Sequence, residues 1–118
     1  MTPAQIISGM TAKNRELQTL NDQLLDLSEE KAQKERTFKV LRAKKFMELK
    51  ANKESVTLIP KLAEGDEEVA KAEFEFKVAE GMFNIVREKI KDVRTAIDTY
   101  RSVLTWKREE YKNVNISE

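Results

Sequence analysis

The residues of this sequence best suited to chemistry are basic side chains that surround its single tryptophan, near the C-terminal end. They are Arg101, Trp106, Lys107, Arg108 and Lys112. Arginine and lysine neutralise phosphates, and an aromatic ring among them can stack on an unpaired nucleic-acid base. The cluster is therefore a candidate surface for single-stranded DNA or for a protein partner. The alternative is that Trp106 anchors a contact between two copies of the chain.

A second basic patch lies within "KERTFKVLRAKK", residues 34 to 45, and consists of Lys39, Arg42, Lys44 and Lys45. These side chains could also contact phosphates. Glu73, Glu75 and Glu80 follow later in the chain, on the segment expected to lie opposite. Pairing with these glutamates is the structural alternative, and the charge pattern favours it over a second nucleic-acid site.

Catalytic chemistry has little support in the sequence. There is no cysteine and no histidine, which excludes disulfides, thiolate nucleophiles and Cys/His zinc sites and removes the commonest general base. Only three glycines occur, so no glycine-rich phosphate loop can form. Adjacent acid pairs such as Glu29–Glu30 point about 100° apart on a helix and make no carboxylate dyad. We expect no enzyme, no cofactor and no bound metal.

Composition indicates one helical domain, residues 1–118. Charged residues make up 36% of the chain, but the net charge is only +1, so any attraction for DNA must be local. The N-terminus has no basic segment followed by an apolar run, and no stretch is long and apolar enough to span a membrane. We expect a cytoplasmic location and no contact with membranes.

Two long helices of similar length account for nearly all of the chain. The first is expected over about residues 3–51, because Thr2, Pro3 and Gln5 form an N-terminal capping signal. A turn with a short helical piece is expected over about 52–65. The second helix is expected over about 66–112, with Asp66 as its N-cap. The predicted fold class is all-α, a long antiparallel two-helix hairpin.

A seven-residue apolar repeat runs through the second helix and predicts a coiled coil. Position a holds Val69, Phe76, Phe83, Ile90, Ile97, Leu104 and Tyr111. Position d holds Ala72, Ala79, Val86, Val93, Tyr100 and Lys107, of which only Lys107 breaks the apolar pattern. The first helix carries a partial version of this repeat. Its seam positions include Ile6, Leu17, Leu20, Leu24, Phe38 and Leu41, and two of them are lysines, Lys31 and Lys34.

The turn and the two repeats together predict a register. In an antiparallel hairpin, the numbers of two facing residues always add to the same total. If the turn is centred between residues 58 and 59, this total pairs apolar seam positions of the two helices with one another. Expected pairs are Leu17 with Tyr100, Leu20 with Ile97, Leu24 with Val93, Phe38 with Ala79, Leu41 with Phe76, and Ile6 with Tyr111. Lys31 and Lys34 either lay their stems across apolar neighbours, with the ammonium in water, or open the seam to another chain.

A second apolar track widens the seam of the second helix on one flank. It comprises Val78, Met82, Ile85, Ala96, Val103 and Trp106. One partner helix cannot cover so wide a stripe, so the track predicts self-association into a homodimer or higher oligomer. A four-helix bundle built on a two-fold axis is the simplest such assembly.

The segment "KVLRAKKFMELKANKESVT", followed by "DEEVAKAEFEFKVAEGMFNIVREKIKDVRTAIDTYRSVL", resembles small phage and prophage proteins of early recombination and replication modules. The resemblance covers about two-thirds of the chain and includes no catalytic signature. It implies a phage-infected bacterial host and an accessory role around DNA recombination or replication. The alternatives are a coiled-coil scaffold protein and a phage inhibitor of a host nuclease or defence enzyme.

Overall fold

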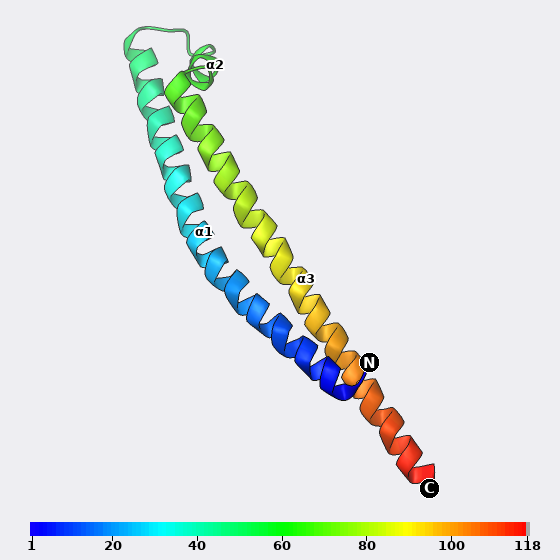
Figure 1. The fold of residues 1–118 in the computed structure, drawn as a ribbon. Helices are drawn as coiled ribbons and strands as arrows, with labels where there is room; N and C mark the ends of the chain where they lie inside the picture. The colour runs from blue at the N-terminus through cyan, green and yellow to red at the C-terminus, as the bar shows by residue number, and fades with distance from the viewer. Residues whose placement is uncertain (118) are drawn as a thin grey trace. The chain divides into compact units, whose positions relative to one another are not determined.

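The computed structural model describes residues 1–117, with side chains described through Val114. It contains α1 (Pro3–Ala51), α2 (Ile59–Glu64) and α3 (Glu67–Ser117), of 49, 6 and 51 residues, and no strand in the described range (Figure 1). The all-α fold class predicted from the sequence is therefore confirmed. Both prolines stand in the first turn of a helix, where the missing N–H costs nothing.

Helix α1 begins at the predicted capping box. The Thr2 N–H donates to Gln5 Oε1 at 2.8 Å, and the Gln5 N–H donates to Thr2 Oγ1 at 3.2 Å. Two amides that the first turn would leave unpaired are thus satisfied reciprocally.

Helix α1 ends at a residue in the left-handed region. Lys53 has φ 62° and is the only non-glycine residue among the described ones with positive φ. The N–H of Glu54 donates to the Leu49 carbonyl, and the N–H of Lys53 donates to the Lys50 carbonyl. This pair of bonds is a Schellman motif, which usually places glycine at the left-handed position.

Helix α3 begins at its predicted cap but is longer than predicted. The Asp66 carboxylate accepts the Val69 N–H at 3.1 Å, and Glu67 and Glu68 put negative charge in the first turn. The helix then continues to Ser117, whereas the sequence predicted an end near Lys112. Asn113 lowers helix propensity only slightly, and no proline or glycine follows it to stop the helix.

The structure divides into two compact units, which are described separately. In the first, Met1–Leu24 packs antiparallel to the part of α3 that begins at Val86. Its buried residues include Ile6 and Leu20 from α1 and Val93, Ile97 and Leu104 from α3, all of them predicted seam positions. The apolar repeat of α3 therefore marks the buried face correctly.

The predicted register is wrong in this first unit. A Cβ at Gly9 would lie 2.7 Å from Tyr100 Cζ, so the Tyr100 ring sits on Gly9 and not on Leu17. Ile6 is fully buried, while its expected partner Tyr111 is 70% exposed. The helices are displaced by about one heptad, because a seven-residue repeat cannot distinguish a register from one shifted by seven residues.

The second unit, Leu25–Ile85, contains the remainder of α1, α2 and the start of α3. Its apolar cluster consists of Phe38, Val69, Ala72 and Phe76, with Leu41 packed against it. The rings of Phe38 and Phe76 stack with centroids 6.0 Å apart. Ile59 and Ala63 of α2 are also buried, so this short helix is part of the fold and not a loose tip.

Lysines at the seam of this unit are used in two ways. The Lys31 ammonium lies over the Phe83 ring, 4.7 Å from its centroid, in a cation–π contact. Lys34 reaches Glu75 at 3.4 Å. The geometry supports the interpretation that both lysines remain within their own hairpin.

Candidate binding surfaces

The end of α3 forms an open groove with the start of α1. Since the Tyr100 ring lies against Gly9, the last turns of α3 extend past the start of α1, as Figure 1 shows for this unit. The groove is lined by Pro3, Thr105, Lys107, Arg108, Glu109, Glu110, Tyr111, Lys112 and Val114. It contains three of the five predicted site residues.

Trp106 is not among the residues that line this groove. Successive helix residues turn by about 100°, so Trp106 points between about 120° and 160° away from Arg101, Arg108 and Lys112. Trp106 is 62% exposed, and the Lys107 Nζ lies over its ring, 5.4 Å from the ring centroid. The aromatic side chain in the groove is Tyr111, which sequence reasoning had assigned to the seam.

Acidic neighbours reduce the positive charge at this end. Arg101 lies 3.6 Å from Asp98, and Lys112 lies 3.9 Å from Glu109. Both are exposed pairs within one helix and are worth little individually. A polyanion could displace them at low cost, because each carboxylate would return to water.

The second basic patch is largely used in contacts within the fold. Lys39 forms a 2.7 Å ion pair with Glu35, and this hydrogen bond lowers the pKa of the Glu35 carboxyl. The Arg42 guanidinium lies over the Phe38 ring, 4.8 Å from its centroid. Lys44 is exposed. Of the predicted cross-pairs with Glu73, Glu75 and Glu80, the structure shows one to Glu75, made by Lys34.

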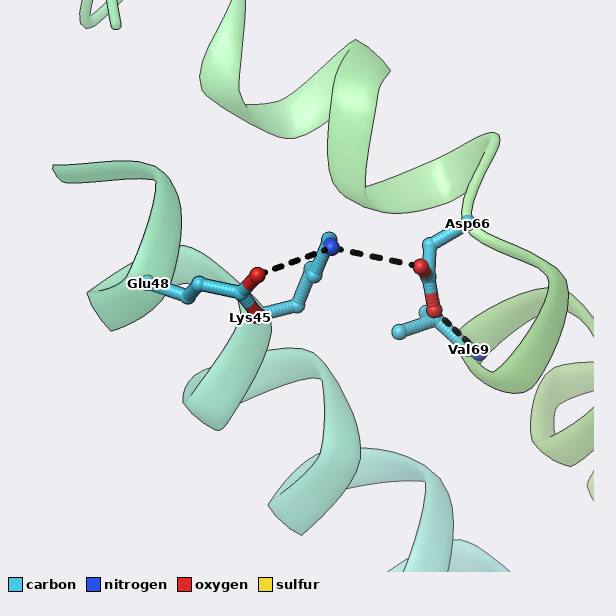
Figure 2. A network of polar contacts seen from close by, with 4 residues as sticks. All are labelled: Lys45, Glu48, Asp66 and Val69. Atoms are coloured by element: carbon cyan, nitrogen blue, oxygen red, sulfur yellow. Dashed lines mark hydrogen bonds and ion pairs between the residues drawn. The ribbon is translucent and has the colours of Figure 1, made fainter. Parts of the chain in front are cut away.

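Lys45 joins α1 to the cap of α3 (Figure 2). Its ammonium lies 3.3 Å from Asp66 and 3.5 Å from Glu48. The Val69 N–H, and then Lys45, hold the pKa of Asp66 below its ordinary value of 3.8. The same bond with Asp66 raises the pKa of Lys45. Lys45 is thus a structural contact, and little of this patch is left for phosphates.

An apolar stripe on α3 in the second unit is left uncovered by these contacts. It consists of Phe74, Val78, Met82 and Ile85, which are 69%, 46%, 48% and 59% exposed. Sequence reasoning found three of them but missed Phe74, because that residue occupies a heptad position normally facing solvent. A large aromatic at such a position was the available signal. In the other unit, Trp106 is exposed while Ala96 and Val103 are half-buried.

Gly81 lies within the stripe, between Val78 and Met82. A Cβ built at this glycine would meet nothing within 4 Å. The stripe therefore contains a shallow position where another backbone can approach closely.

Comparisons with protein-family models, with curated proteins and with solved structures found no match. Within the described residues, no helix is both long enough and apolar enough to cross a membrane.

Proposed function

We propose that this chain is a non-enzymatic binding protein that self-associates and acts as an accessory factor in phage DNA recombination or replication. The observation that carries the proposal is the exposed stripe of Phe74, Val78, Met82 and Ile85. Burying a fully exposed large apolar side chain contributes about 1.5–3 kcal/mol, and these four are about half exposed, so covering them on both copies favours association. A four-helix bundle is the assembly we favour.

Light scattering at micromolar concentration tests this self-association. We expect a mass that is a multiple of the 13.7 kDa chain. A 13.7 kDa species at every concentration would contradict self-association. The phage setting and the accessory role rest on the sequence resemblance to proteins of recombination modules, and they have a separate test.

Single-stranded DNA is the second candidate ligand, and the groove at the end of α3 favours it. Lys107, Arg108 and Lys112 surround Tyr111 there, so phosphate contacts and base stacking can occur together. Arg101 lies on a nearby face of the same helix. The proposed site is this groove, with Tyr111 in the stacking role first assigned to Trp106.

A titration of fluorescent single-stranded DNA at several salt concentrations tests the groove. Three phosphate contacts predict a log–log salt slope of about −2. Lys107→Glu/Arg108→Glu should abolish binding, and Tyr111→Ala should weaken it by roughly tenfold or more, whereas the matched control Trp106→Ala should bind like the parent. Equal losses in Tyr111→Ala and Trp106→Ala would contradict the assignment of the stacking residue.

The accessory role predicts an effect on strand pairing. In a mixture with a single-strand annealing protein, the parent chain should change the rate at which complementary strands anneal. The double variant Lys107→Glu/Arg108→Glu should leave that rate unchanged. No effect of the parent would favour the alternatives, a coiled-coil scaffold or an inhibitor of a host nuclease or defence enzyme.

A further inference from the structure

Four arginines recur at intervals of seven residues along α3 in the first unit. They are Arg87, Arg94, Arg101 and Arg108, and all four are exposed. In two helices packed as a coiled coil, a seven-residue spacing keeps a side chain at the same position relative to the neighbouring helix. No proline or glycine lies in α3 after Gly81, so nothing kinks the helix here. The arginines therefore form one straight row of about 32 Å, which we call the arginine track.

The face of α3 that carries the track is more basic than the rest of the helix. At 100° per residue, an arc of about 100° contains six basic residues and two acids between Val86 and Val114. The basic residues are the four arginines with Lys91 and Lys112, and the acids are Asp98 and Glu109. The remaining charged residues of this stretch are two lysines and three acids, namely Lys89, Lys107, Glu88, Asp92 and Glu110. Positive charge is thus concentrated on one face of a chain whose net charge is only +1.

Existing ion pairs leave this face available to a polyanion. Three of its basic residues pair with acids of the same helix at 3.2–3.9 Å: Lys91 with Glu88, Arg101 with Asp98, and Lys112 with Glu109. In each pair both side chains are at least 60% exposed, so the pair contributes little. A phosphate offers arginine two parallel hydrogen bonds, so exchange of these acids for phosphates is favourable.

The flank of α1 beside the track carries amides in place of charges. Asn14 lines a hollow together with Arg94 and Arg101. Asn21 lies one heptad further along the same flank, and Gln18 lies one turn from Asn14. All three amide side chains are exposed, and amide N–H groups are common donors to phosphate oxygens. The nearest charged residues of α1 beyond this flank have opposite signs: Arg15 and Asp22.

A nucleic-acid backbone suits this face better than an acidic protein helix. A helix docked along the track would need apolar side chains to pack against. Among the residues described for this unit, the exposed side chains on this flank are polar or charged except for Ile7. A docked helix would therefore bury little apolar surface. Binding to a polyanion depends instead on neutralisation of phosphates by basic side chains.

We propose that the arginine track binds the phosphodiester backbone of single-stranded DNA, with one phosphate in the hollow between Asn14, Arg94 and Arg101. The track extends the DNA site proposed above, since it shares Arg108 with the groove. The backbone of a B-form duplex winds once around its axis in about 34 Å, so a straight row of similar length follows one strand over only part of its course. A flexible single strand can lie along the whole row.

Fluorescence anisotropy with DNA of two lengths tests the track. A strand of about five nucleotides fills the groove, whereas one of about 20 nucleotides exceeds the usual size of a single-strand site. The log–log salt slope should be about −2 for the short strand and about −4 for the long one, because three further arginines then contact phosphates. Equal slopes would overturn the track. A duplex of the longer length should bind more weakly, and equal or tighter duplex binding would overturn the assignment to a single strand.

The double variant Arg87→Gln/Arg94→Gln removes two charges of the track and leaves the groove intact. Both side chains are exposed and glutamine favours helix, so circular dichroism should match the parent. The variant should bind the long strand roughly tenfold more weakly at low salt, with a slope flatter by about 1.4, and the short strand like the parent. The matched control Arg15→Gln/Lys89→Gln removes the same charge from other faces of the two helices and should bind both strands like the parent. Equal losses in the two double variants would overturn the track.

Failure of the track and failure of the groove have different signatures. If Arg87→Gln/Arg94→Gln binds the long strand like the parent while Tyr111→Ala binds it weakly, the track is overturned and the groove stands. If the opposite is found, the track stands without the groove. If the parent binds neither strand at low salt, both are overturned, and an acidic protein becomes the partner to test.

Discussion

Asp66 connects two parts of the second unit through one carboxylate. It caps α3 by accepting the Val69 N–H, and it pairs with Lys45 of α1. The cap was readable from the sequence, since Asp66 follows Gly65 and precedes two glutamates. The ion pair was not, because it depends on which turn of α1 comes to lie beside the cap.

We predict that Asp66→Ala lowers the melting temperature by roughly a few degrees, because it removes both the cap and the ion pair. Asp66→Asn should lower it less, since an amide oxygen still caps the helix. Circular dichroism melting curves measure both variants. Equal losses would mean that the cap contributes nothing.

The lowered pKa of Asp66 sets the sign of the pH dependence. A carboxyl whose pKa is depressed by folding stabilises the fold above its ordinary pKa of 3.8 and loses that effect as pH falls through the lower folded value. The difference in melting temperature between the parent and Asp66→Asn should therefore be constant near pH 6 and shrink below pH 4. A difference that grows on acidification would contradict the assignment.

At the scale of the elements, the caps and the buried face of α3 followed from local patterns, but the register did not. The helix starts at Pro3 and Glu67 depend on side chains within one turn, so the sequence determines them locally. The pairing of α1 with α3 depends on where the hairpin turns. Helix α2 packs into the fold: its Pro60 lines the same hollow as Phe46 and Val69, so α3 begins its pairing near Lys45, further from the C-terminal end of α1 than a simple turn would place it.

The contact between Gly9 and Tyr100 gives a direct test of this register. Glycine inside a helix costs about 1 kcal/mol relative to alanine, so Gly9→Ala should stabilise the chain by that amount where space permits. With Tyr100 present, its ring occupies that space, and the gain should fall to near zero. In the Tyr100→Ala background the full gain should appear. Equal gains in both backgrounds, measured by urea unfolding, would contradict the contact between Gly9 and Tyr100.

At the scale of the whole molecule, stability and assembly should be linked. Each unit has a narrow core, and four large side chains of one helix remain outside it. If a second copy covers them, association stabilises the folded state by mass action. The melting temperature of the parent should then rise by roughly a few degrees over a hundredfold increase in protein concentration. Calorimetry at several concentrations measures this rise.

The control for this linkage compares two exposed valines, Val78 on α3 and Val40 on α1. Val78→Asp should melt at a temperature that does not depend on concentration, because it removes the interface without touching the core. Val40→Asp should keep the concentration dependence of the parent. If the melting temperature of the parent is constant over the same range, folding does not depend on self-association. The stripe would then be a binding surface for a different partner.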